Sequence, residues 1–375
     1  MRLTILFPAL LAAIGTAAHA QANTPSTPTA AEVVAVYEIN RARSDPQAYD
    51  AEQGLGGVLD GIPSAQPLAI NERLVTSARF HSSEMAANGY FAHTSPITGD
   101  QPNRMVRNAG YPLASFLGNN ANGVESIAVL FTSAPGGITY HPGMAIRALI
   151  LDDGIDPPGH RHHLLAWGQS QSEINYYRSF REVGAGYAEG FRPEFPYNPS
   201  TAPDGSGGYW TIHTGFRDVD RPWLCGVVYN DVNSNGRYDA GEGLGGVNVS
   251  ATGASSLAAT TGDAGAFSLE VLLTGAYTVS CSGGAFAGTA TQVATVGSIN
   301  TWLDFRSGQA DATVNFDNII GGPTGEELEK PASGNGCAAG QSSGVVFWLQ
   351  FAALLCGFMS LTLHRRSPRP RPRSA

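Results

Sequence analysis

Residues 231–242 have the residue types and the spacing of a calcium-binding loop. Calcium takes about six to eight oxygen ligands, which a twelve-residue loop supplies from positions 1, 3, 5, 7, 9 and 12 around a glycine at position 6. Gly236 stands at that glycine position. A turn rich in Asn, Gly and Asp that holds no ion is the alternative. We expect calcium here, with the ligands Asp231, Asn233, Asn235, Arg237 (through its backbone carbonyl), Asp239 and Glu242.

Histidines at helical spacing form a second group of residues that could do chemistry. His160 and His163 share one face if their segment is helical, because side chains three residues apart are neighbours on a helix. Neutral imidazoles bind zinc, and they also act as general acids and bases. His81 and Glu84 lie one turn apart and are either mutual partners or surface residues. The chain has neither an H-E-x-x-H motif nor a serine nucleophile elbow on a strand-to-helix turn, so the signal for hydrolysis is weak.

Two regions of different pattern would position these residues. In residues 31–218, apolar residues recur at helical spacing and two segments are rich in β-branched and aromatic residues. The expected helices are 32–41, 71–88, 142–152 and 160–165, and the expected strands are 183–187 and 209–216. In residues 222–308, short runs of small and β-branched residues are broken by Gly, Asp and Asn, which is typical of an all-β domain. The predicted class is α+β, followed by a β-sandwich.

Both ends of the chain predict export. Residues 1–20 have one positive charge, a short apolar run and an A-x-A pattern, as signal peptides do, although a buried N-terminal helix is the alternative. Residues 344–363 lack charged side chains, and about 20 apolar residues suffice for a transmembrane helix. Residues 364–375 contain five arginines and no acid, which favours the cytoplasmic side. Residues 309–343 have the Gly- and Ser-rich composition of a linker. The sequence predicts an ectodomain held at the cell membrane.

Charge and cysteine content narrow the partners and the chemistry. The net charge is -9, and setting aside Arg2 and the five tail arginines leaves 16 basic against 31 acidic residues, or about -15. This excess of acid argues against nucleic acid as a partner. Export permits disulfides, so Cys225 and Cys281 are a candidate pair, and two buried free thiols are the alternative.

The order of several motifs resembles the CAP superfamily (cysteine-rich secretory, antigen 5 and pathogenesis-related 1 proteins). The segments that carry the resemblance are 81–85, 91–96, 123–128, 159–165, 182–187 and 209–211. The resemblance implies an α-β-α sandwich whose cleft holds two histidines and two acids that can take a divalent metal. Carried across, these are His93, His160 and Glu125, with Asp152 or Asp153 as the second acid. Ser126 and His163 depart from the family, which usually has Asn at both positions.

The cleft residues admit three interpretations. Imidazoles and carboxylates are ligands suited to zinc, the same groups could supply an acid and a base, or they could only hydrogen-bond across the cleft. CAP domains are mostly secreted binding modules, and lipid or sterol binding is reported for some. The resemblance therefore favours binding of an extracytoplasmic ligand, such as a lipid or another cell-envelope component. The alternatives are a metal-dependent hydrolase and a purely structural or adhesive surface protein.

The second region resembles the B-type repeats of bacterial surface proteins (SdrD B-like, close to Cna B-type domains). Residues 243–249, 261–267 and 275–279 carry the match, and the resemblance implies a stiff β-sandwich stalk in which calcium rigidifies a loop. Cys337, which precedes the apolar segment and the arginines, resembles the C-terminal sorting signals of such proteins and is a candidate processing site.

Overall fold

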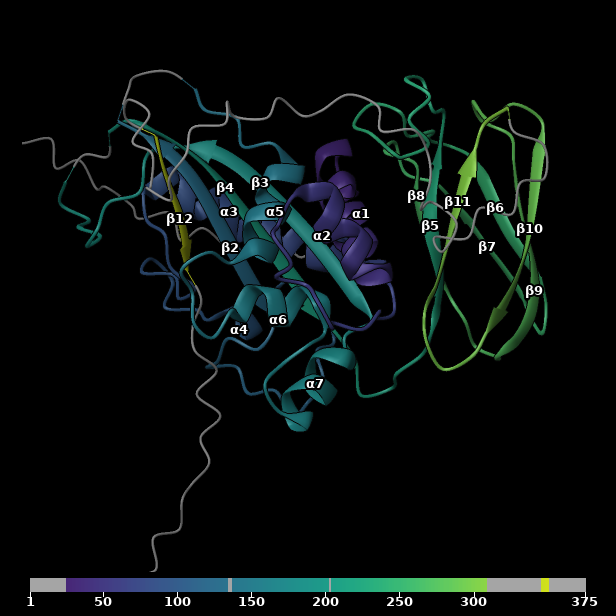
Figure 1. Ribbon diagram of the computed structural model, residues 1–375, viewed down its shortest axis with the longest axis horizontal. Helices are drawn as coiled ribbons and strands as arrows, with labels where there is room; N and C mark the ends of the chain where they lie inside the picture. Colours follow the sequence, from purple (N-terminus) through teal and green to yellow (C-terminus); the bar gives the residue numbers. More distant parts are fainter. Residues whose placement is uncertain (1–24, 134–136, 202–203, 309–344, 351–375) are drawn as a thin grey trace, which may run out of the picture.

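The computed structural model describes residues 25–133, 137–201, 204–308 and 345–350, and Figure 1 shows their arrangement. The predicted signal peptide, Cys337, most of the predicted span and the basic tail lie outside the described residues. The described chain is a mixed α+β protein: helices and one sheet come first, and two further sheets follow. The predicted fold class is confirmed at this level.

Five of the seven helices described in the first domain start at a residue whose side chain caps the helix. Helix α1 (Ala30–Ser44) begins with a capping box, in which the Glu32 amide donates to Thr29 Oγ1 (3.3 Å) and Thr29 N donates to Glu32 Oε2 (2.8 Å). The expected helices are confirmed as α1, α3, α5 and α6, and three shorter ones were not expected. The remaining helices are α2 (Pro46–Gln53), α3 (Glu72–Asn88), α4 (Pro102–Asn108), α5 (Pro142–Leu151), α6 (Gly159–Leu165) and α7 (Gln171–Arg178).

The sheet of the first domain has the order β1-β3-β4-β2-β12. Strand β3 pairs parallel with β1, and β4 pairs antiparallel with both β3 and β2. Both strands expected from the sequence are confirmed, as β3 and β4. The strands are β1 (Ala69–Ile70), β2 (Glu125–Thr132), β3 (Glu182–Gly190), β4 (Ser206–Gly215) and β12 (Val345–Gln350).

Strand β12 comes from the segment predicted to cross the membrane. It pairs antiparallel with β2, with Val345 opposite Thr132 and Gln350 opposite Ile127. The described part of the predicted span is therefore a strand and not a helix, because its apolar, β-branched start can also complete a sheet edge. Among the residues described, no helix has both the length and the hydrophobicity that a membrane span requires.

Helices cover both faces of this sheet. Successive residues of β2 point to opposite faces, so Ala128 and Leu130 join the core with α1, α5 and α6, whereas Ile127 and Val129 join a second core with the end of α3. Every residue of β2 is therefore buried. Helix α3 can lie directly on β3 because Gly184 leaves room for it: a Cβ there would come within 2.1 Å of the Leu74 and Val75 backbone.

The second domain is a β-sandwich of two sheets. One sheet has the order β10-β9-β6-β7 and the other β11-β5-β8, and their inner faces share one apolar core. The strands are β5 (Trp223–Tyr229), β6 (Asn248–Gly253), β7 (Ser256–Thr260), β8 (Ala266–Glu270), β9 (Gly275–Ser282), β10 (Thr289–Val296) and β11 (Thr301–Arg306).

The candidate disulfide is wrong in this structure, where Cys225 and Cys281 are both buried free thiols. Cys281 belongs to the core between the two sheets, whereas Cys225 lies in a separate cluster against α1. Cys225 on β5 thus points away from the core into which Cys281, on β9 of the other sheet, projects. Burial raises the pKa of the Cys281 thiol to about 12, so this thiol stays protonated.

The two domains are packed against each other, with α1 between the first sheet and the sandwich (Figure 1). Tyr37 of α1 meets Tyr238 edge-on, with ring centroids 5.8 Å apart. Asp304 is buried at this interface and accepts hydrogen bonds from Trp302 Nε1 (2.6 Å) and the Tyr37 hydroxyl (3.2 Å). Burial raises the pKa of Asp304 to about 7 despite these donors. The sandwich is therefore a docked partner of the first domain, not a separate module on a free linker.

Candidate functional site

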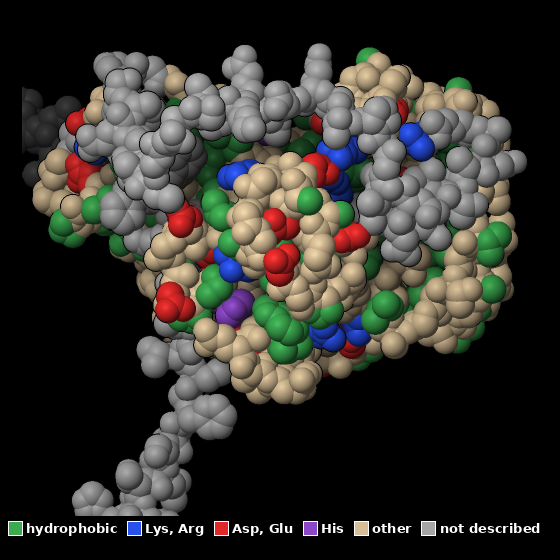
Figure 2. All heavy atoms as spheres, viewed as in Figure 1, with side chains coloured by type: hydrophobic (Ala, Val, Ile, Leu, Met, Phe, Trp, Pro, Cys, Tyr) green, Lys and Arg blue, Asp and Glu red, His purple; other side chains and the backbone are tan. Residues whose placement is uncertain are grey.

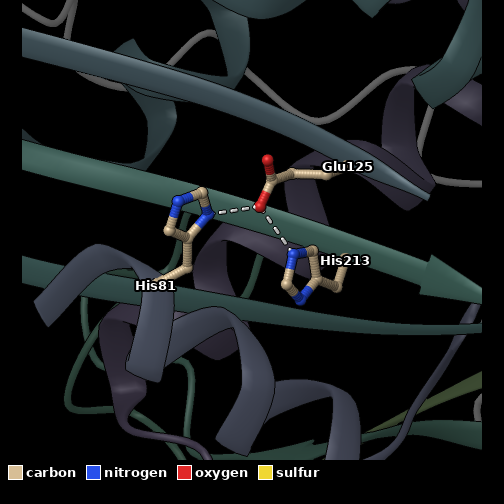
Figure 3. A group of neighbouring side chains, drawn as sticks. All are labelled: His81, Glu125 and His213. Carbon is tan, nitrogen blue, oxygen red and sulfur yellow. Dashed lines mark hydrogen bonds and ion pairs between the residues drawn. The ribbon is translucent and has the colours of Figure 1, made fainter. Parts of the chain in front are cut away.

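Three histidines surround the carboxylate of Glu125, which is the first residue of β2 (Figure 3). Glu125 Oε2 lies 2.5 Å from His81 Nδ1 and 2.7 Å from His213 Nε2. Glu125 Oε1 lies 2.7 Å from His93 Nδ1. Helix α3 supplies His81, β4 supplies His213, and the segment after α3 supplies His93. We call these four residues the Glu125 centre.

The Glu125 centre is held in place by regular structure. The register of the sheet puts Glu125 directly opposite His213, so the two side chains leave neighbouring strands on the same face. Helix α3 packs across that face and brings His81 to the same carboxylate. Asn122 fixes the start of β2, because its Oδ1 accepts a hydrogen bond from the Glu125 amide (3.0 Å).

Burial sets the electrostatics of the centre. The exposed fractions are 0% for His81 and His213, 2% for Glu125 and 8% for His93. Burial alone would raise the pKa of Glu125, but the imidazoles, His81 first, hold it well below its ordinary value. Burial lowers the pKa of His213, although Glu125 opposes the shift. At neutral pH the centre therefore contains a buried carboxylate that needs positive charge or N–H donors around it.

The donor set of the centre fits a divalent metal. Among the described residues, His81, Glu125 and His213 each offer one ligand atom, and these atoms all lie within 4.8 Å of one another. The other nitrogen of each ring, His81 Nε2 and His213 Nδ1, is buried without a hydrogen-bond partner and lies on the side away from Glu125 (Figure 3). Two imidazoles and one carboxylate are the ligand types of zinc sites. The residues present thus could hold a transition metal, through ligand atoms that hydrogen-bond to one another in this structure.

The predicted cleft residues divide into two pairs. His93 joins Glu125, while His160 joins Asp152, whose Oδ1 lies 2.6 Å from His160 Nδ1 and whose Oδ2 accepts from the His160 amide (2.9 Å). Asp152 and His160 are both buried, whereas Asp153 is exposed. Of the two candidate acids, the structure therefore brings Asp152 and not Asp153 to a histidine.

The two departures from the CAP pattern contact each other. Ser126 Oγ lies 2.7 Å from His163 Nδ1, and Thr214 Oγ1 lies 2.7 Å from His163 Nε2. Burial lowers the pKa of His163 to about 3, so the ring is neutral and donates through only one nitrogen. His160 and His163 share a helix, but each bonds a different partner and they do not act as the local pair that their spacing suggested.

His81 and Glu84 are neither mutual partners nor surface residues, so both alternatives given for them from the sequence are wrong. Both are buried; His81 contacts Glu125, and Glu84 Oε2 accepts from the Tyr90 hydroxyl (2.6 Å). Side chains three residues apart on a helix are neighbours, but these two bond residues of other segments instead of each other. Sequence reasoning missed His81 and His213 as partners of Glu125, since 44 and 88 residues separate them from it.

The predicted calcium loop is closed by hydrogen bonds from its own amides to its acidic side chains. Gly236 has a positive φ of 77°, as the template requires of its glycine. Asp239 Oδ2 accepts from the side-chain amides of Asn233 (2.9 Å) and Asn235 (2.7 Å). The oxygens of the same two amides accept from the backbone, Asn233 Oδ1 from the Asn235 amide (3.1 Å) and Asn235 Oδ1 from the Arg237 amide (2.8 Å).

The carboxylates at the last and first ligand positions of the loop, Glu242 and Asp231, accept hydrogen bonds from backbone amides of the loop. Glu242 accepts from the backbone amides of Val232 (2.9 Å) and Asp239 (3.0 Å), so the last ligand position folds back onto the loop. Asp231 Oδ2 accepts from the Gly236 amide (3.0 Å), while Asp231 Oδ1 is buried and has no hydrogen-bond partner. Arg306 Nη1 lies 3.5 Å from the same Asp231 Oδ2, and calcium binding by this loop stays a prediction.

Comparison with known proteins adds no assignment: no family model matches the chain, and no curated protein matches it significantly.

Proposed function

We propose that this chain is an exported surface protein, held in the cell membrane by residues 344–363, whose first domain is a CAP-like binding module. Its ligand is extracytoplasmic, such as a lipid or another cell-envelope component. The docked SdrD B-like sandwich carries a calcium ion in residues 231–242. The Glu125 centre is a structural site for a divalent transition metal of the zinc class, held by His81, Glu125 and His213.

The observation that supports a structural role for the Glu125 centre, rather than a hydrolytic one, is the complete enclosure of the Glu125 carboxylate. His81 and His213 have no exposed surface, so a substrate cannot touch either ring while the fold is intact. A hydrolytic site needs its base and its activated water at a surface that substrate can reach. The enclosed centre thus favours a structural role, and a bound metal there would compensate the buried charge. Of the four side chains of the centre, His93 alone has exposed surface, at 8%.

The anchor and strand β12 are alternative positions of one segment. Residues 345–350 pair with β2 in this structure, and a membrane helix of 344–363 requires that strand to leave the sheet. The β1-β3-β4-β2 part of the sheet keeps its helices on both faces without β12. The proposal therefore expects the first domain to remain folded when the segment is in a bilayer.

Metal analysis of the purified full chain tests the centre. We expect about one zinc-class ion per chain, and the double variant His81→Ala, His213→Ala to lose it. The matched control is His162→Ala, which changes a histidine that pairs with Glu173 (3.2 Å) outside the Glu125 centre. Wild-type chain that refolds in zinc and still contains no transition metal would rule out the metal site.

Cell fractionation and mass spectrometry test the anchoring. We expect the full chain in the membrane fraction, with an N-terminus at Gln21 and with residues 345–350 inaccessible to protease added outside the cells. A mature C-terminus near Cys337 would instead show that the segment is removed, and a chain found only in the cytosol would contradict the proposal.

A further inference from the structure

One end of the sandwich carries large hydrophobic side chains that face solvent. They sit on three separate loops of the sandwich end and one loop of the first domain, and we call them the junction surface. The residues, with their exposed fractions, are Phe116 (69%), Val219 (64%), Leu272 (58%), Leu273 (57%) and Ile299 (53%).

Strand register shows that the sandwich loops meet at the same end. Trp223 at the start of β5 pairs with Glu270 at the end of β8, and Val296 at the end of β10 pairs with Gly275 at the start of β9. Strand β11 also starts at this end, because Thr301 pairs with Leu224. The loops 271–274 and 297–300 and the connection 217–222 are therefore neighbours. Figure 1 shows them at the lower end of the sandwich, where the chain enters from the first domain.

The first domain contributes to the same surface through Phe116. The Ser115 amide donates to Asp218 Oδ1 (3.0 Å), and the Phe116 ring lies 5.6 Å from that of Phe216. The connection is in turn held to the sandwich, since the Val271 amide donates to the Pro222 carbonyl (2.9 Å). The loops that carry the junction surface are thus held to the rest of the molecule by these contacts.

The charges beside the junction surface are balanced. Arg181 pairs with Asp220 (2.9 Å), and Arg217 pairs with Glu270 (3.2 Å). Arg221 lies 3.8 Å from the same Glu270. In Figure 2, hydrophobic side chains reach the lower edge of the molecule close to basic and acidic ones. A partner of strong charge of either sign therefore gains little here, and an electrically neutral apolar partner fits best.

We propose that the junction surface inserts into the outer face of a zwitterionic lipid bilayer. Single Leu, Ile and Phe side chains on separate turn tips suit a fluid acyl region, because a protein partner would require one continuous groove or face. The inference rests on the anchoring proposed above. The 36 residues from 309 to 344 can extend about 120 Å. An anchored chain can therefore bring this end of the molecule to the membrane.

Amide hydrogen exchange of the full chain tests the docking. The chain is compared in phosphatidylcholine nanodiscs and in amphipol, which holds the apolar segment without a bilayer. We expect exchange in 271–274 and 297–300 to slow at least about tenfold in the nanodisc. In the double variant Leu272→Ser, Leu273→Ser, the nanodisc should no longer slow exchange, either in 271–274 or in 297–300. Val293→Ser, which removes an apolar side chain from the outer face of β10 (65% exposed), should keep it.

The possible failures separate the two proposals. Equal exchange in nanodisc and amphipol, or loss of protection in the Val293 variant as well, would overturn the docking while leaving the anchoring intact. A chain that does not enter nanodiscs at all contradicts the anchoring. Flotation of that chain with phosphatidylcholine vesicles then decides the docking, and an absence of flotation would overturn it too.

Discussion

Arg237 of the calcium loop holds Glu52 of the first domain by two hydrogen bonds, Nη1 to Oε1 (2.7 Å) and Nη2 to Oε2 (2.6 Å). Arg41 also pairs with Glu52. Burial would raise the pKa of Glu52, but Arg41 and Arg237 together lower it. Tyr238, the next loop residue, packs on Tyr37 of α1. The loop predicted to bind calcium is therefore also a contact between the domains.

Replacing the Arg237 side chain tests that contact separately from calcium binding. Arg237→Ala keeps the backbone carbonyl proposed as a ligand but removes the pair with Glu52. We expect the free energy of unfolding to fall by about 0.5 kcal/mol, since the pair is partly exposed. Denaturant unfolding of the full chain measures it. Glu52→Gln should cost a similar amount, and the double variant should cost less than the sum. Fully additive losses would show that the two side chains do not interact.

Calcium should raise the thermal stability of the wild-type chain. A ligand at about 100 times its dissociation constant stabilises the folded state by about 2.7 kcal/mol. Asp231→Asn removes the charge at the first ligand position and should abolish most of the calcium-dependent rise in Tm. Asp263→Asn is the matched control, because Asp263 is exposed and lies outside the loop. A chain whose Tm is the same in calcium and in chelator would contradict the calcium site.

The Glu125 centre should be sensitive to loss of its central carboxylate. Glu125→Gln leaves three buried imidazoles facing an amide that cannot accept from all of them. Breaking one partner of a buried charged group costs about 3 kcal/mol or more. Denaturant unfolding measures this loss. Glu173→Gln is the control, because the Glu173–His162 pair (3.2 Å) is partly exposed and should cost less than about 1 kcal/mol. Equal losses in the two variants would mean that burial does not distinguish the sites.

Periodicity predicted the elements that are long or strongly patterned. The helices around residues 71–88 and 142–152 were found within one residue of their observed bounds, as α3 and α5. Helices α4 and α7, with seven and eight residues, were missed because so few turns show little of an apolar face, although α6, also of seven residues, was expected. Strand β2 was not predicted, because it is buried on both faces and lacks the alternation of apolar and polar residues that marks a half-buried strand.

The site was predictable only as far as local motifs reach. The segment 123–128 indicated Glu125, and 91–96 indicated His93, but neither motif carries information about α3 or β4. His81 and His213 reach Glu125 only because β4 pairs with β2 and α3 lies across them. Pairing of strands distant in sequence is set by the assembled core rather than by spacing. The calcium loop, whose candidate ligands lie within twelve residues, needed no such information.

The close approach of α3 to β3 makes Gly184 a sensitive position. Gly184→Ala would place a Cβ 2.1 Å from the Leu74 and Val75 backbone, so the helix must move outward. Overpacking of this kind costs about 3 kcal/mol, which denaturant unfolding should detect. Gly118→Ala is the control, because nothing lies within 4 Å of the added Cβ. If both variants unfold at the same denaturant concentration, α3 does not pack on β3 as described.

Asp304 should make the domain interface less stable as the pH rises. Its folded pKa, about 7, is above the ordinary value of 3.8, so the folded state holds an extra proton between these values. The contribution of Asp304 to stability therefore falls from pH 4 to pH 7, by on the order of 4 kcal/mol. Asp304→Asn mimics the protonated carboxyl and can keep the Trp302 and Tyr37 contacts. It should flatten the pH dependence of Tm over this range and be more stable than wild type at pH 8. Asp263→Asn should keep the wild-type slope. An unchanged slope in the Asp304 variant would show that another group titrates.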